Sequence, residues 1–447
     1  MRLIDWAAFA AAITFAGAAA AQTGDALPFD PEVATRQWLD TMGPEATARS
    51  NAYFEGGYWI QFVGPLLSII VSMAMMALGF AKGVRSWLEK AVKFYFLVTL
   101  GMALFYNLIS TVLTFPFTYY VGFVREHQFG LATQDFPAWF NEQLIGAGIG
   151  LVIGSIAIAV LYLIIRATKR TWWLWGTGAT LVFVAILAML APVYISPIFN
   201  SYTPMQEGAL KTSILQMAQA SGVPADNVYE FDVSRQSNRV TANVSGFMST
   251  TRISLSDTLL QRESPGGVRS VLGHEIGHYV LNHTVSLLVM NVLLIMAMFA
   301  LANVLFNWLS KGERWGVRDV SDPAGMPLLF AILAFLGAVA TPINNNIIRF
   351  HEMQADIFGV NAAREPDGFA ESALLLSEYR KMEPTPLEEW FFYDHPSGYT
   401  RIHMAMQWKA HEMAAGRYPV GPGGPPEGWR PDFVVMHAPA PAAGAPD

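Results

Sequence analysis

The chain has 447 residues, of which 53% are hydrophobic and only 14% are charged. Soluble globular domains carry about 25% charged residues, so a lipid bilayer is the expected solvent for much of this chain. It contains no cysteine, which excludes disulfides, thiolate metal ligands and cysteine nucleophiles. The net charge is −7 and no dense basic block occurs, so nucleic acid is not an expected partner.

The N-terminus, residues 1–22, has one early arginine, a short apolar stretch and small residues in an Ala-x-Ala pattern. These features are typical of a secretory signal peptide, although the acidic Asp5 is unusual in one. A short first membrane helix is the alternative interpretation, and the sequence does not separate the two. Residues 23–57 are expected to form an extramembrane segment.

Six stretches without a charged residue follow, and each approaches the ~20 apolar residues that a helix needs to cross hydrocarbon. They are residues 58–80, 94–120, 143–165, 172–195, 284–309 and 327–348. We therefore predict a mainly α, polytopic membrane protein with four spans in residues 58–195 and a two-span hairpin in residues 284–348. Lys and Arg residues follow the first, third and fifth spans, and the positive-inside rule places these three loops in the cytoplasm.

The region between the fourth and fifth spans, residues 196–283, is not membrane-like. Thr203, Pro204 and Gln206 have the spacing of a helix N-cap, a first turn and a capping box. Gly222 is expected to end this helix. The sequence thus predicts that a folded extramembrane unit begins here.

Three short runs rich in Val, Ile, Thr and aromatic residues then predict β-strands, at residues 227–233, 239–247 and 251–257. Ser264 and Pro265 are expected to cap and start a further helix, which contains the sequence HEIGH. This helix is too polar and glycine-rich to face lipid. We predict a small α+β unit, with the HEIGH helix at the membrane edge near the fifth span.

Two histidines of this helix, His274 and His278, lie at positions i and i+4. Both imidazoles then project from one helix face and can reach a single metal ion. Glu275 can address the open coordination position as a general base. The pattern is typical of helical zinc proteases, and a pair of interfacial histidines without metal is the alternative interpretation.

A third ligand is expected after the sixth span, where the chain returns to the side of the membrane that carries HEIGH. The sequence RFHEMQAD begins there, with Glu352 and Asp356 again at i and i+4. Glu352 is the predicted third ligand, and Asp356 is predicted to hold a ligand histidine by a hydrogen bond. His351 competes as a ligand, but it projects about 100° away from Glu352 on a helix. A solvated helix face is the alternative for the two carboxylates.

Six motifs in order resemble those of the type I CAAX prenyl endopeptidases, the multi-spanning zinc metallopeptidases that process prenylated protein C-termini. They are EHQFGLATQDF (126–136), YISPIFNSYTPMQEGALK (194–211), RISLSDTLL (252–260), HEIGHYVLNHT (274–284), RFHEMQAD (349–356) and HPSGYTR (395–401). The resemblance covers most of residues 58–410. The smaller four-helix membrane heat-shock peptidases share the zinc motif but lack the FGLATQDF loop between two further spans.

The resemblance implies one Zn²⁺ per chain, held by His274, His278 and Glu352, with Glu275 as the base. It also implies that Asn243 lies on an edge strand of the active site that pairs with an extended substrate. The family's usual run around that strand is longer and more aromatic than the one found here.

The spacing from His395 to Arg401 matches the family's His-Pro-x-x-x-x-Arg motif. A histidine there could donate a hydrogen bond to the tetrahedral oxyanion, and an arginine could brace the zinc-binding carboxylate. A capped turn with one surface arginine would be the interpretation without the resemblance. Residues 349–415 are thus expected to form a helical segment that supplies the third ligand and this motif. Residues 416–447 are rich in Pro, Gly and Ala, which predicts a disordered tail.

These features predict a membrane-embedded zinc endopeptidase that cuts membrane-associated or hydrophobic polypeptides, so that a polypeptide substrate and the lipid bilayer are its expected partners. A transporter would carry ionisable residues in several spans, and these spans have almost none. A scaffold with a structural zinc would not need Glu275. A membrane quality-control protease of the heat-shock type is a further alternative. The charge bias favours a periplasmic site in a bacterial inner membrane, whereas the family resemblance favours a cytoplasmic one.

Overall fold

A computed structural model describes residues 27–245, 251–313 and 315–433. Within these ranges six helices are long and apolar enough to cross a membrane, some of them continuing through a short π-helical or 3-10 turn. They are α3 (Gly43–Ala77), α5 to α6 (Tyr95–Gln128), α7 (Phe136–Ala167), α8 to α9 (Trp172–Phe199), α13 (His283–Leu309) and α14 with its preceding turn (Pro323–Ala363). The predicted number of spans is confirmed. The signal-like residues 1–22 lie outside the described residues.

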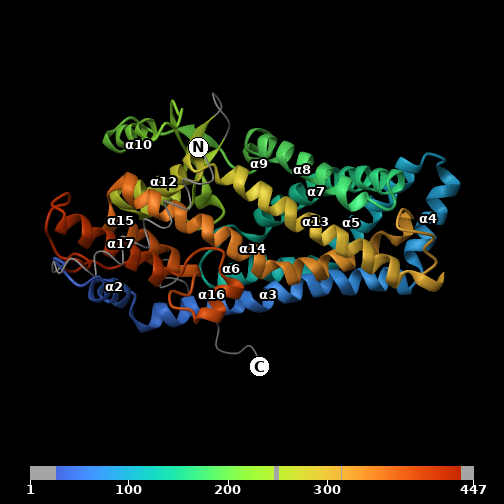
Figure 1. The fold of residues 1–447 in the computed structure, drawn as a ribbon, viewed down its shortest axis with the longest axis horizontal. Coiled ribbons are helices and arrows are strands. Elements are labelled where there is room, and N and C mark those ends of the chain that lie inside the picture. The colour runs from blue at the N-terminus through green and yellow to red at the C-terminus, as the bar shows by residue number, and fades with distance from the viewer. Residues whose placement is uncertain (1–26, 246–250, 314, 434–447) are drawn as a thin grey trace.

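The membrane helices lie side by side along the long axis of the molecule (Figure 1). Two of them extend well beyond their apolar stretches, because α3 begins at Gly43 and α14 continues to Ala363. The short helix α4 (Phe80–Ala91) lies at one end of this bundle, and the extramembrane helices lie at the other. These are α2 (Pro31–Asp40), α10 (Ala209–Ala220), α11 (Asp257–Arg262), α12 (Pro265–Val280), α15 (Pro366–Leu375), α16 (Pro386–Phe392) and α17 (Gly398–Ala414).

The extramembrane end contains a four-stranded sheet in the order β1-β2-β4-β3. The strands are β1 (Tyr202–Pro204), β2 (Val228–Phe231), β3 (Ala242–Ser245) and β4 (Arg252–Ser256). β2 and β4 are parallel, whereas β1 and β3 run antiparallel to their neighbours. The three predicted strand regions are therefore confirmed, and β3 forms one edge of the sheet.

The predicted start of the helix near Thr203 is wrong. Tyr202–Pro204 is the edge strand β1, in which Thr203 pairs with Glu230 and Pro204 with Tyr229 of β2. Proline is tolerated there because an edge strand does not need every backbone N–H for pairing. The helix begins only at Ala209, and its end near Gly222 agrees with the prediction.

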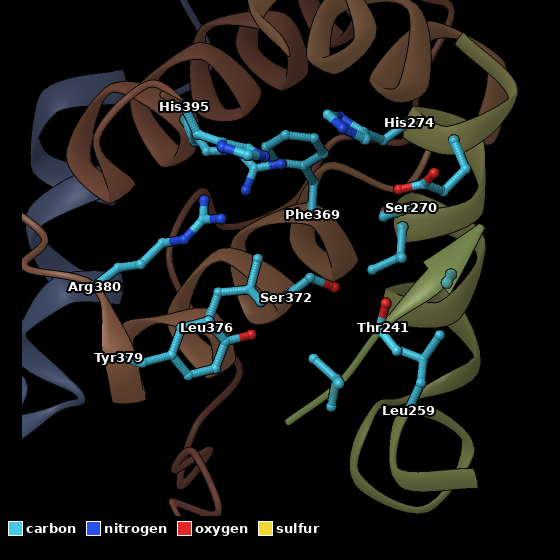
Figure 2. A pocket seen from close by; sticks show the side chains of 15 residues that line it. Thr241, Leu259, Ser270, His274, Phe369, Ser372, Leu376, Tyr379, Arg380 and His395 are labelled. Carbon is cyan, nitrogen blue, oxygen red and sulfur yellow. The ribbon is translucent and has the colours of Figure 1, made fainter. Parts of the chain in front are cut away.

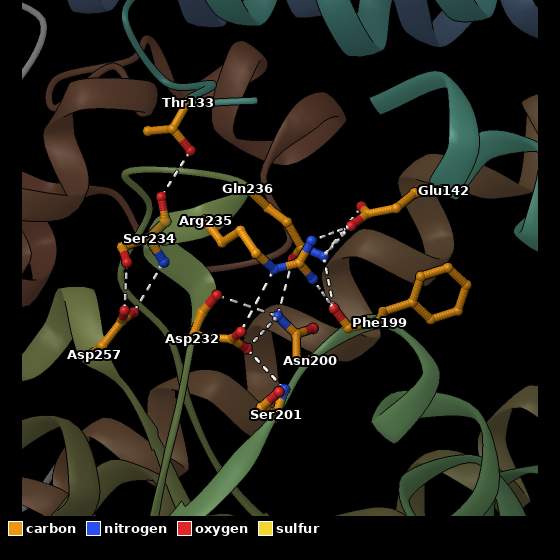
Figure 3. Close-up of polar contacts among 10 residues, drawn as sticks. All are labelled: Thr133, Glu142, Phe199, Asn200, Ser201, Asp232, Ser234, Arg235, Gln236 and Asp257. Carbon is orange, nitrogen blue, oxygen red and sulfur yellow. Dashed lines mark hydrogen bonds and ion pairs between the residues drawn. The ribbon is translucent and has the colours of Figure 1, made fainter. Parts of the chain in front are cut away.

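A polar network joins the α+β unit to the membrane helices (Figure 3). Arg235 and Gln236, in the turn after β2, both donate hydrogen bonds to Glu142 of α7, at 2.8 and 3.1 Å. In the loop between α6 and α7, the hydroxyl of Thr133 donates to the backbone carbonyl of Ser234 at 2.8 Å. These contacts fix the orientation of the sheet relative to the ends of the membrane helices.

The C-terminal segment was expected to be disordered throughout residues 416–447, and its described part differs from that expectation. Trp429 packs edge-on against Trp38 of α2, with ring centroids 5.0 Å apart, and Phe433 is buried. Two large aromatic side chains bury enough apolar surface to order a segment otherwise rich in Pro and Gly. Residues 434–447 lie outside the described residues.

The helices α12 and α14 cross at unusually short distance, and small residues line the crossing. A Cβ atom at Gly359 would lie 2.7 Å from the backbone nitrogen of His274, and one at Gly273 would lie 2.9 Å from the carbonyl oxygen of Gly359. A Cβ at Gly277 would meet Ala355 at 3.2 Å. Any larger side chain at these glycines would push the two helices apart.

We expect Gly359→Ala to lower the free energy of unfolding by about 1–3 kcal/mol, because the added methyl overpacks a contact made of backbone atoms. The measurement is the thermal unfolding midpoint of the detergent-purified protein. Gly57→Ala is the matched control, because it also replaces a helical glycine by alanine. A Cβ at this position meets nothing within 4 Å. Equal midpoints for the two variants would contradict this account of the crossing.

Candidate metal centre

The HEIGH sequence lies on α12, as predicted, and the helix starts as the sequence indicated. Ser264 is the N-cap and accepts a hydrogen bond from the backbone N–H of Gly267 at 3.1 Å, with Pro265 in the first turn. His274 and His278 project from one face, and their Nε2 atoms lie 3.0 Å apart. Two imidazole nitrogens thus face a common point.

α14 brings a carboxylate to the same point. Glu352 Oε2 lies 3.0 Å from His274 Nε2 and 3.5 Å from His278 Nε2. This oxygen is buried, and although imidazole nitrogens lie close to it, none of the described residues makes a well-oriented hydrogen bond to it. A buried carboxylate oxygen that lacks a partner is costly unless a cation compensates it. The three side chains offer ligand atoms within 4.8 Å of one another and could hold one metal ion.

Asp356 orients the first histidine from the opposite side. Its Oδ1 lies 2.8 Å from His274 Nδ1, so the imidazole donates its Nδ1–H to Asp356 and leaves Nε2 free. Arg401, on α17, donates two hydrogen bonds to the same carboxylate, at 2.9 and 2.7 Å. The arginine therefore contacts Asp356 rather than Glu352, the carboxylate it was expected to brace.

The second histidine is held by His283, which sequence reasoning did not assign. The Nδ1 atoms of His278 and His283 lie 2.9 Å apart, and His283 Nε2 lies 3.2 Å from Gln354 Oε1. If His278 uses Nε2 for a metal, its Nδ1–H donates to His283, whose own Nε2–H donates to Gln354. The signal available in the sequence was Asn282, whose positive φ of 54° turns the chain between α12 and α13.

His351, the competing third ligand, faces away from this point. Its Nδ1 bonds the backbone carbonyl of Ile347 and its Nε2 bonds the hydroxyl of Ser286, both at 2.8 Å. Both ring nitrogens are therefore used elsewhere. Glu352 is the residue of this segment that reaches His274 and His278.

His395 closes the cluster from the loop before α17. Its Nε2 lies 3.1 Å from Glu352 Oε2, and its Nδ1 lies 2.8 Å from Asp394 Oδ1. Burial lowers the pKa of His395 below its usual value, and the positive charge of Arg380 lowers this pKa further. Arg380 is a second residue of this region that the sequence did not single out.

A cavity of about 170 Å³ opens beside the cluster. Figure 2 shows His274 and Thr241 on one wall and His395 and Arg380 on the other. Glu275 also lines it, and burial raises the pKa of this carboxyl above its ordinary value. A carboxylate with a raised pKa at a cavity wall is suited to accept and return a proton near neutral pH.

The sheet contributes its free edge to this cavity. Ala242, the first residue of β3, and the two preceding residues, Val240 and Thr241, line the wall. Asn243 follows on the same strand and pairs with Ser254 of β4, but it is not among the cavity-lining residues. Within the described ranges no strand pairs with the other side of β3, which leaves its backbone groups available to an extended peptide.

Two family models match consecutive parts of the chain and together cover most of it. A model described as peptidase family M48 matches residues 204–409, and a model described as the CAAX prenyl protease N-terminal region with five membrane helices matches residues 32–201. Within the second range the described structure has four long apolar helices and the shorter α4. The chain belongs to peptidase family M48 and is an integral membrane metallopeptidase.

Individual relatives agree with this class. The chain is 28% identical to the uncharacterized metalloprotease YhfN of Bacillus subtilis, over 81% of this chain and 86% of that protein. It is 29% identical to CAAX prenyl protease 1 of Saccharomyces cerevisiae, over 68% and 72% of the two chains. The crystal structure of S. mikatae Ste24p has a TM-score of 0.67 at 23% identity and covers 84% of this chain, so the fold is shared.

We expect His283→Leu to weaken metal binding by about 10- to 100-fold, the usual effect of removing the partner of a ligand histidine. The leucine leaves the Nδ1–H of His278 without an acceptor. The measurement is the dissociation constant of the metal in competition with a chelator. His283→Gln keeps an acceptor oxygen and should recover part of the affinity, while equal affinities for wild type and the leucine variant would contradict the assignment.

Proposed function

We propose that this protein is a zinc-dependent endopeptidase that hydrolyses membrane-associated or hydrophobic polypeptides. The observation that carries the proposal is the convergence of His274, His278 and Glu352 on one point, beside Glu275 and a cavity. The cavity borders the open edge of β3. This arrangement combines a metal site, a proton acceptor and a place for an extended peptide.

Zinc is the proposed metal because of the donor set. Two imidazole nitrogens and one carboxylate oxygen are a recurrent ligand set of catalytic zinc, which keeps a further position open for water or substrate. The orphaned Oε2 of Glu352, close to two imidazole nitrogens, fits a bound cation. Thiolate ligands are absent because the chain contains no cysteine.

The proposed mechanism assigns proton transfer to Glu275. When bound, zinc supplies Lewis-acid chemistry, which polarises the peptide carbonyl and makes a bound water more acidic. Glu275 takes the proton of the attacking water on a carboxylate oxygen and returns it to the nitrogen of the leaving amine. Burial of this carboxyl raises its pKa, so the protonated form is accessible during the reaction.

His395 and Arg401 have separate proposed roles. In its protonated form His395 would donate from Nε2 to the oxyanion that develops on the scissile carbonyl, while its Nδ1–H donates to Asp394 at 2.8 Å. Arg401 would act through Asp356, whose carboxylate it holds against His274 Nδ1. Arg401 is thus a positioning residue rather than a group that touches the substrate.

The proposed substrate enters as an extended strand. Among the residues that the structure describes, β3 pairs with β4 alone, so a peptide can add to its other side by backbone hydrogen bonds. Asn243 is proposed to help bind that peptide from its place on β3, next to the cavity-lining Ala242. Several relatives are named CAAX prenyl proteases, and we extend from them the expectation that the substrate is held at the membrane.

We propose that the metal centre faces the periplasm in a bacterial inner membrane. Residues from the three Lys/Arg-containing connections, such as Lys93, Lys169 and Arg318, line one cavity at the bundle end opposite α12. Short basic connections stay in the cytoplasm. The centre at the other end would then lie outside the cytoplasm.

We expect Glu275→Gln to retain about one zinc per chain and to lower the rate of peptide hydrolysis by about 100-fold or more. The amide keeps the shape of the side chain but cannot accept the proton. The measurement combines metal analysis of the purified variant with cleavage of a fluorogenic peptide.

Glu207→Gln is the matched control for this experiment, since the Glu207 side chain is 86% exposed and does not line the cavity of the centre. It should retain wild-type activity. Full activity of Glu275→Gln would remove Glu275 from the mechanism, and lack of zinc in the wild type would remove the metal assignment.

The orientation can be tested by single-cysteine labelling, because the natural chain contains no cysteine. Glu207→Cys, at the end of the metal centre, should react in intact spheroplasts with a maleimide that does not cross membranes. Arg170→Cys, in the turn between α7 and α8, should react only after permeabilisation. The reverse pattern would place the centre in the cytoplasm.

A further inference from the structure

A second cavity, of about 570 Å³, lies at the end of the bundle away from the metal centre. Three separate connections line it: the segment from α4 to α5, the end of α7 with the turn after it, and the loop before α14. The lining residues that bear on the argument are Glu89, Lys93, Tyr95, Arg166, Lys169, Arg318, Asp319 and Asp322. Charged side chains therefore dominate a cavity that lies at the ends of membrane helices.

Each of the carboxylates that line this cavity already has a cationic partner. Glu89 receives two hydrogen bonds from Arg318, both at 2.7 Å, and Asp319 pairs with Lys169 at 2.6 Å. Asp322 is buried and pairs with Arg85 at 2.5 Å. No carboxylate that lines the cavity is left without a cationic partner.

Two cations of the cavity remain without such a partner. Neither Lys93 nor Arg166 forms an ion pair or a side-chain hydrogen bond with any of the residues that the structure describes. The guanidinium of Arg166 lies over the ring of Tyr95, 4.1 Å from its centroid, which holds it in place. Tyr95 is also the first residue of α5, whose N-terminus has no side-chain cap. Positive charge thus lines the cavity beside a helix N-terminus that has no side-chain cap.

The segment from α4 to α5, which lines part of this cavity, also exposes large aromatic side chains. α4 buries Arg85 and Leu88 on one face, while Trp87 is 58% exposed and Phe94, at the start of α5, is 74% exposed. A short helix with a buried face and exposed aromatic side chains, next to the ends of membrane helices, is typical of the headgroup layer. At the ends of the membrane helices, the cavity lies at the depth expected for lipid headgroups.

We propose that this cavity binds the headgroup of an anionic phospholipid, with its phosphate between Lys93 and Arg166. Arginine and lysine bind phosphate oxygens by charge-assisted hydrogen bonds, and basic pockets between membrane helices are known lipid headgroup sites. The exposed Trp87 and Phe94 would contact the acyl chains, which free phosphate does not have. This site is independent of the proposed peptidase function.

The test compares lipid binding by wild type and by the double variant Lys93→Gln/Arg166→Gln. Each protein, purified in detergent, is equilibrated with phosphatidylglycerol or phosphatidylcholine of identical acyl chains, and bound lipid is counted by native mass spectrometry. We expect wild type to bind phosphatidylglycerol preferentially, and the variant to bind it about 30-fold more weakly, as loss of two cations near a headgroup predicts. Binding of phosphatidylcholine should not change.

The matched control is Lys90→Gln/Arg170→Gln, which removes the same charge from the same connections at two exposed residues outside the cavity lining. An equal loss of binding in this control would overturn the proposal in favour of diffuse attraction. Displacement of the lipid by an equal concentration of inorganic phosphate would overturn the lipid assignment. If the double variant does not purify as a folded protein, Lys93→Gln alone should still show a smaller loss of the same selectivity.

Discussion

The close crossing of α12 and α14 is the constraint on which the metal centre depends. Gly273 and Gly359 let the backbones of the two helices touch, since a Cβ at either position would lie within 3.0 Å of the other helix. At that separation Glu352 and Asp356 reach the two sides of the His274 ring. Protein interiors are close-packed and transmit strain, so a larger side chain at either glycine would displace Glu352 and Asp356 from His274.

Charge balance explains how carboxylates are tolerated at this crossing. The two hydrogen bonds from Arg401 balance the charge of Asp356, which still accepts a hydrogen bond from His274 Nδ1–H. Glu352 has no comparable guanidinium, and its Oε2 has no hydrogen-bond partner among the described residues. Uncompensated buried charge is strongly destabilising. The arrangement around Glu352 is therefore best understood as half of an ion pair whose cation is a metal.

The sequence was informative where a signal is local and periodic. Charge-free stretches predicted the spans, and the i and i+4 spacing predicted which faces of α12 and α14 carry the polar groups. It failed where long-range pairing decides: Pro204 belongs to a strand because β2 lies beside it, and Trp429 is ordered because it meets Trp38. His283 was missed because it lies on α13 whereas His278 lies on α12. The helical spacing that relates residues within one helix does not predict a contact between two helices.

α14 also explains why a water-using centre belongs to a membrane protein. The helix begins at Met326, just after the charged loop in which the buried Asp322 pairs with Arg85 of α4, crosses the bundle, and continues to Ala363 at the proposed metal centre. Because one helix is both a span and the carrier of Glu352, the bundle sets the position of that ligand relative to α12. The hydrophobic length of the span and the glycines at its far end thus determine together where the carboxylate lies. A soluble domain could hold the same three side chains, but it would not place them at a fixed depth from the membrane, where the proposed membrane-held substrate would reach the edge strand β3.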